Sequence, residues 1–186
     1  MYIARKYKEN NIVEYILYMW HIEEIIRSMN LDIETIDEKI ISAFDLNQVA
    51  REEIRDWYKT LITEMRKQGI HEKGHLAELS ELLIELTYLH HSLLTLYQDK
   101  DYQQLLAAAQ PSIDELKKKG MGPAKNDIET AMNGLFGVLV LKLKKREVSQ
   151  ATQDAIKNIS AMMAHLAKQY HRMKEGKLDL PKVMGN

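Results

Sequence analysis

The chain has 186 residues, no cysteine and a formal net charge of −1. This length is enough for one domain that buries about 70% of the surface exposed by its unfolded form, so the fold needs no metal or disulfide to hold it together. The absence of cysteine excludes disulfides, thiolate zinc sites and cysteine nucleophiles, and it fits a reducing compartment, so we expect a cytoplasmic protein.

The sequence has no segment typical of a signal peptide or a membrane-spanning helix. The apolar stretch that starts at Ile12 is interrupted by Glu14, His21 and Glu23, which does not match the apolar core of a signal peptide. The longest uninterrupted apolar stretch, 135–141, is far shorter than the roughly 20 residues that a spanning helix needs. We therefore expect no membrane association.

Charge is distributed unevenly along the chain. Residues 1–99 hold 11 basic and 18 acidic side chains (net −7), whereas residues 100–186 hold 15 basic and 9 acidic ones (net +6). Such asymmetry indicates either a basic nucleic-acid face or two halves that attract each other, within the fold or across a dimer. We favour the second interpretation, which predicts a protein partner or a homodimer.

Apolar residues recur at the three-and-four spacing of helices along the whole chain, and the alternation typical of strands is missing. The sequence therefore predicts an all-α protein, a single up-and-down-type bundle of six or seven helices that forms one domain over residues 1–186, with a loose C-terminal tail from about residue 177. The predicted helices are 11–29, a short one after Asp32, one opened by Asp45 and ended by Gly69, 75–98, one opened by Asp101, one capped by Asn126, and one from Ser149 to Gly176. At Pro111 we expect the helix opened by Asp101 either to kink or to divide into two abutting short helices.

The sharpest chemical motif is H-E-x-x-H, formed by His71, Glu72 and His75. On a helix this spacing places two imidazoles on one face to hold zinc, while the glutamate activates the bound water. Three features oppose this function: Lys73 adds a positive charge, Gly74 weakens the helix, and no distant third ligand is evident. We therefore predict a polar interhelical connection without catalytic residue, metal or cofactor. The alternative is a metal-dependent hydrolase with His71 and His75 as zinc ligands and Glu72 as the general base.

Three other polar residues mark positions where a small-molecule pocket would lie. His90 falls in the centre of an apolar stripe, where it either binds a ligand or is satisfied by a backbone carbonyl and a tyrosine; the second is the commoner arrangement. Glu14 shares an edge of its helix with His21 and Ser28, which favours a solvent-facing seam.

Two basic clusters, 117–119 and 142–146, end successive predicted helices. Cations at a helix C-terminus complement the helix dipole and need no ligand. If the two helices are antiparallel neighbours, the clusters lie at opposite ends of the bundle and form no continuous track, so we do not expect nucleic-acid binding.

The chain begins with MYIA at Met1–Ala4 and continues with NIVEYILYMWHIE at Asn11–Glu23. In these segments it resembles an all-helical family of Bacteroidetes-type bacteria that is described only as a domain of unknown function. The resemblance implies a cytosolic bacterial protein with a helical fold, and it transfers no catalytic residue. We therefore expect a non-enzymatic helical interaction or structural module that associates with itself; a metal-dependent hydrolase or a small-molecule-binding regulator is the alternative.

Overall fold

The computed structural model describes residues 2–119 and 126–178, which are helical with no strand among them. The prediction of an all-α fold is confirmed, and this part of the chain contains eight α-helices, more than the six or seven expected. The helices are α1 Tyr2–Asn10, α2 Ile12–Ser28, α3 Ile33–Lys39, α4 Gln48–Lys67, α5 Ala77–Thr95, α6 Lys100–Lys118, α7 Asp127–Leu143 and α8 Gln150–Lys174, with a 3-10 turn, η1, at Ile41–Ala43.

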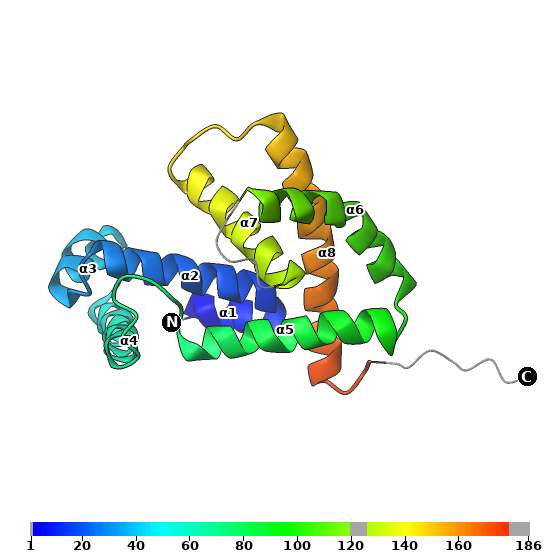
Figure 1. Ribbon diagram of the computed structural model, residues 1–186. Helices are drawn as coiled ribbons and strands as arrows, with labels where there is room; N and C mark the ends of the chain where they lie inside the picture. Colours follow the sequence, from blue (N-terminus) through cyan, green and yellow to red (C-terminus); the bar gives the residue numbers. More distant parts are fainter. Residues whose placement is uncertain (1, 120–125, 179–186) are drawn as a thin grey trace, which may run out of the picture.

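The helices are arranged around α8, which crosses the molecule and packs against α2, α5, α6 and α7 (Figure 1). α3 and α4 lie at the far end of α2 (Figure 1). Buried side chains from all eight helices belong to one hydrophobic cluster, in which Trp20 and Tyr102 are among the largest that are fully buried. None of the helices in the described ranges is long and apolar enough to cross a membrane.

Local hydrogen bonding sets where the helices begin. Asn126 caps α7 by accepting a bond from the Glu129 amide, and Ser149 caps α8 in the same way, as predicted. The predicted caps Asp45 and Asp101 are wrong, because α4 is capped by Asn47 and α6 by Asp99. In both cases the capping oxygen accepts a bond from the backbone N–H three residues later, and a second aspartate or asparagine two positions away offered the same chemistry.

One helix and the start of another differ from the sequence-based expectation. α1 was not predicted, yet it buries Ala4 and packs Tyr7 against the core. α5 begins at Ala77 and not at residue 75, so the segment before it is a loop. α6 is continuous through Pro111 and bends along its length, as the proline predicted (Figure 1).

Two glycines occupy positions where a side chain would be strained or would clash. Gly69 follows the end of α4 with φ +69°, a left-handed conformation that favours glycine at a helix stop. A Cβ on Gly134 would lie 2.7 Å from Leu116, so the missing side chain lets α6 approach α7 closely. The last helix ends at Lys174, and the predicted loose tail falls outside the described residues from 179 onward.

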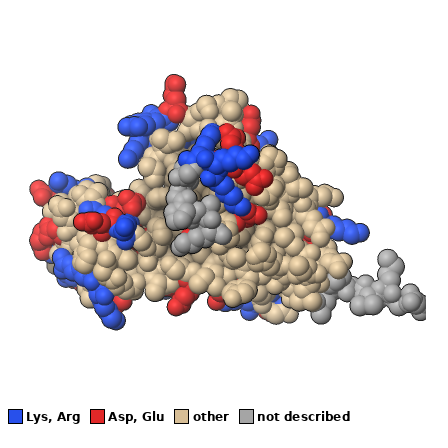
Figure 2. Space-filling model, viewed as in Figure 1, with Lys and Arg blue, Asp and Glu red and all other residues tan. Residues whose placement is uncertain are grey.

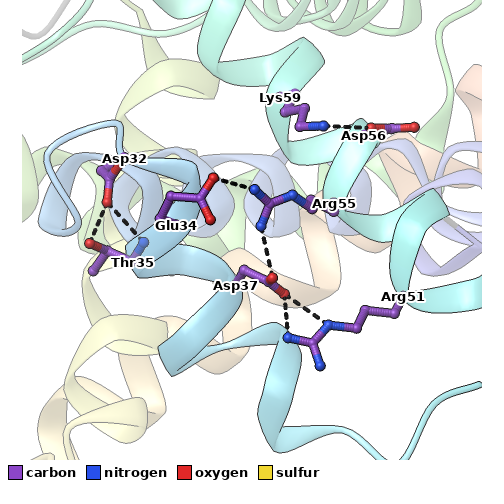
Figure 3. A network of polar contacts seen from close by, with 8 residues as sticks. All are labelled: Asp32, Glu34, Thr35, Asp37, Arg51, Arg55, Asp56 and Lys59. Carbon is purple, nitrogen blue, oxygen red and sulfur yellow. Dashed lines mark hydrogen bonds and ion pairs between the residues drawn. The ribbon is translucent and has the colours of Figure 1, made fainter. Parts of the chain in front are cut away.

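An ion-pair network joins α3 to α4 (Figure 3). Asp37 accepts bonds from Arg51 and Arg55, with Arg55 Nη1 2.7 Å from Asp37 Oδ2. Arg55 also pairs with Glu34 one turn earlier on α3. Asp37 and Arg55 thus each pair with two partners across the α3–α4 connection, and removing either residue breaks two of its ion pairs.

Candidate ligand-binding site

A cavity of about 440 Å³ lies where α2, the loop before α5, α5 and the start of α7 meet. Trp20 of α2 and His75 of the loop form one part of its lining. The polar groups that line the rest come from both neighbouring helices: Ser80 and Thr87 of α5, and Asn126, Glu129 and Asn133 at the start of α7. Apolar and polar groups thus converge on one concave surface, which is the usual form of a small-molecule site.

Glu23 lies directly behind this cavity and is only 1% exposed. Its Oε2 is 2.6 Å from His75 Nδ1, and its Oε1 accepts a hydrogen bond from the backbone N–H of Leu76 at 2.8 Å. Arg27, one turn further along α2, has Nη2 3.9 Å from the same carboxylate. A carboxylate that is almost completely removed from water is therefore satisfied by two hydrogen bonds from the loop and by the nearby charge of Arg27.

The Glu23 carboxylate decides how the His75 imidazole can act. An ionised carboxylate only accepts hydrogen bonds, so His75 must carry a proton on Nδ1 and donate it to Glu23. Nε2 is then an acceptor when the ring is neutral and a donor when it is protonated, and it makes no hydrogen bond within the described ranges. The side chain is 32% exposed, so Nε2 is available for a ligand.

Trp20 fixes the plane of this imidazole. The two rings stack with centroids 4.3 Å apart and planes inclined by 15°. Phe136 of α7 meets the indole edge-on at 5.5 Å. Trp20 is 1% exposed, and its Nε1 has no hydrogen-bond partner in the part of the chain that the structure describes. A buried donor without an acceptor costs on the order of 1–3 kcal/mol, so such groups call for an explanation.

Arg27 holds the loop in place from below. Its guanidinium donates hydrogen bonds to the backbone carbonyls of Ile70 and Gly74 and pairs with Glu24 at 2.7 Å. Gly74 has φ +95°, a conformation that residues with a side chain rarely adopt. The turn at Gly74 and the hydrogen bonds from Arg27 together place His75 next to Glu23.

The zinc-motif residues are not arranged as the motif requires. His71 and Glu72 are exposed in the loop, and α5 starts only at Ala77, so the two histidines do not lie on one face of a helix. Within residues 2–119 and 126–178, no group of three His, Cys, Asp or Glu side chains is placed to hold a metal ion. Of the three motif residues, the structure brings only His75 into the cavity.

His90 is satisfied within the core. It is 5% exposed, and its Nδ1 lies 2.7 Å from the hydroxyl of Tyr102 on α6, the tyrosine partner that sequence reasoning anticipated. Burial lowers the pKa of His90 and raises that of Tyr102. Tyr102 stacks on His165 of α8, whose Nε2 is 2.8 Å from Asp99. This chain of contacts ties α5, α6 and α8 together and lines none of the cavities described here.

Glu14 and His21 occupy the seam predicted for them. Glu14 is exposed and His21 half-buried, and desolvation lowers the pKa of His21. Both residues line a cavity of about 340 Å³ between α2 and α7, on a different side of α2 from Glu23. The residue that sequence reasoning missed is therefore Glu23, whose partner lies 52 positions away.

Fold and site together define an all-α protein with a carboxylate-supported histidine beside a small cavity. The chain belongs to the family described as Domain of unknown function (DUF4924), whose model matches residues 1–177. No curated protein and no solved structure matches it.

Proposed function

We propose that this protein binds a small polar molecule in the cavity between α2, α5 and α7, and that it does so without catalysing a reaction. One observation supports the proposal above all: Glu23 holds His75 through Nδ1 and leaves Nε2 without a partner among the described residues, in a cavity that Trp20 also lines. The buried indole N–H of Trp20 has no acceptor within the same ranges, and a ligand acceptor that reached it would offset the cost of that donor.

The lining limits the chemistry of the ligand. His75 and Trp20 call for a molecule with both a hydrogen-bond donor and an acceptor. The amides of Asn126 and Asn133 carry both kinds of group and can pair with either. No lysine or arginine occurs among the described residues that line the cavity. The lining therefore offers no cationic partner to a carboxylate or phosphate, which favours an uncharged or cationic ligand, such as a polyol, amide or amine.

The cellular setting belongs to the same proposal. A cytoplasmic location is supported by the absence of cysteine in 186 residues. A bacterial origin of the Bacteroidetes type is supported by the resemblance of the N-terminal segments. We propose no resident metal or cofactor, because the loop around His71 and His75 lacks the helical geometry on which a zinc site of this motif depends.

Nuclear magnetic resonance of the indole N–H groups tests the binding proposal directly, since the chain contains only two tryptophans. Trp20 lines the cavity, whereas Trp57 of α4 lies outside it and serves as an internal control. A panel of polyols, primary amides and primary amines is titrated against the protein beside matched carboxylates. We expect a saturable shift of the Trp20 signal with an uncharged or cationic compound, and no shift of Trp57.

A conservative variant separates binding from folding. His75→Gln keeps an N–H that can donate to Glu23 but replaces the imidazole. The dissociation constant obtained from the Trp20 shift should therefore rise by about tenfold, which corresponds to one lost hydrogen bond. The matched control His71→Gln changes an exposed residue of the same loop and should leave the titration unchanged. Absence of a saturable Trp20 shift with every class, or equal binding by His75→Gln, would refute the proposal.

A further inference from the structure

A continuous groove runs between α2 and α7 on a different face from the His75 cavity. It consists of the cavity of about 340 Å³ that contains Glu14 and a second one of about 670 Å³, and the two share His21 and Leu143. Its floor is apolar and includes Phe136 and Val140. Leu143 at the junction is 52% exposed, so a large apolar side chain faces the groove with half its surface uncovered.

The two walls of the groove carry opposite charge. The α2 wall holds the acids Glu14 and Glu24, and the α7 wall holds cations at the end of that helix. The cations are Lys142, Lys144 and Arg146. Figure 2 shows Lys and Arg side chains gathered where α7 ends. The walls come from the acidic and the basic half of the sequence, respectively.

Along the groove, each acid of the α2 wall lies in the same cavity as a cation of the α7 wall. Glu14 and Lys142 line the same smaller cavity, and Glu24 lines the larger one with Lys144 and Arg146. Yet no ion pair crosses the groove between described residues, and Glu24 pairs instead with Arg27 on its own helix. The helix dipole accounts for cations in the last turn of α7, but it accounts neither for the apolar floor nor for the acids level with them.

We propose that this groove is the interface of a homodimer. A two-fold axis that runs along the groove places the α2 wall of one protomer over the α7 wall of its partner at the same level. Glu14 of each protomer then faces the partner's Lys142, and Glu24 faces the partner's Lys144 and Arg146. The apolar floors close on each other, so the surface is complementary to itself in shape and in charge.

Charge reversal tests this arrangement on the full chain. Sedimentation velocity over a concentration series should show a monomer–dimer equilibrium for the unaltered protein. Glu14→Lys and Lys142→Glu each create two like-charge contacts across the interface, so each should raise the dimer dissociation constant by at least about tenfold. The double variant exchanges both charges within one chain and should restore dimerisation, because each contact is again between opposite charges.

Controls separate the groove from general charge effects and from folding. Lys118→Glu makes the same charge change on an exposed residue at the end of α6, where it should leave the dimer unchanged. Leu143→Asn should weaken the dimer while the melting temperature of the monomer, measured at dilutions where both proteins are dissociated, stays nearly unchanged, since the side chain is half exposed in the monomer. Because the chain lacks cysteine, separately made Glu14→Cys and Lys142→Cys variants should form a disulfide with each other when mixed and oxidised.

Each other outcome counts against the proposal. A monomer at all concentrations overturns the dimer. A dimer that tolerates both single reversals, or a cross-link that fails to form, overturns the groove as its interface. If the single variants lose dimerisation and the double variant does not recover it, the proposed two-fold pairing of Glu14 with Lys142 is wrong. The outcome is independent of the ligand-binding proposal, because His75→Gln should dimerise as the unaltered protein does.

Discussion

Glu23 of α2 and His75 of the loop before α5 form a contact of 2.6 Å between groups 52 positions apart in the chain. The carboxylate is buried, and it also accepts the backbone N–H of Leu76. Glu23 of α2 thus supplies the side-chain acceptor at the N-terminus of α5, where Leu76 itself provides no side-chain cap.

Removing the Glu23 carboxylate should destabilise the fold. We expect Glu23→Ala to lower the free energy of unfolding by about 3 kcal/mol, because two hydrogen bonds to a charged group are lost and the Leu76 N–H stays buried without its acceptor. The neighbouring Glu24→Ala removes a half-exposed carboxylate and should cost less than about 0.5 kcal/mol. Urea denaturation of both variants measures the difference, and equal effects would contradict a structural role for Glu23.

The buried His90 should make stability depend on pH. Its folded pKa is lowered by burial, whereas in the unfolded chain it titrates near its ordinary value of about 6.5. The unfolded state therefore binds more protons between these two values, so the stabilising effect is complete above about pH 6.5 and declines as the pH falls. We expect the free energy difference between the unaltered protein and His90→Gln to shrink on acidification, as followed by urea denaturation at several pH values. His21→Gln provides the comparison for the second histidine with a lowered pKa.

The network in Figure 3 predicts an unequal pair of effects. Asp37→Ala breaks the contacts of both Arg51 and Arg55, whereas Arg51→Ala breaks one. Partly exposed ion pairs contribute up to about 1 kcal/mol each, so we expect a loss of about 1 kcal/mol for Asp37→Ala and a smaller one for Arg51→Ala. Thermal unfolding in low and high salt tests this, since screening should reduce both losses. A loss that salt does not change would mean that packing, and not charge, joins α3 to α4.

Zinc should not bind through the H-E-x-x-H motif. α5 begins only at Ala77, so His71 and His75 do not share one face of a helix, and no group of three His, Cys, Asp or Glu side chains among the described residues is placed to hold a metal ion. We expect isothermal titration of untagged protein with zinc to show no saturable binding at these residues. His71→Ala and His75→Ala should therefore leave the titration unchanged. Saturable binding that both variants abolish would instead support the hydrolase hypothesis.

The sequence allowed the fold class to be predicted because helix formation in this chain is locally specified. Apolar spacing located seven of the helices, and the caps at Asn126 and Ser149 follow from side chains that bond backbone groups only three residues away. The first residue of a helix is predicted wrongly where two neighbouring residues can both act as the cap, as Asp99 and Asp101 can. It also fails at α1, whose helix depends on tertiary contacts of Ala4 and Tyr7.

The candidate site was only half visible in the sequence. His75 was identified for a motif whose geometry is absent, while Glu23 appeared only as an interruption of an apolar stretch. Its significance depends on the course of the loop at Gly74 and on the position of Arg27, which no local pattern contains. A charged residue on a helix that is apolar on both sides was the one available signal, since such a residue must find a partner in the interior.

The central position of α8 has a consequence for how the protein is made. Its residues Ile159, Met163 and Leu166 are almost completely buried against helices that the ribosome produces earlier. Until α8 emerges, the sides of the nascent α2, α5, α6 and α7 that it covers stay open to water and to chaperones. The growing chain is therefore prone to aggregation until α8 is released from the ribosome.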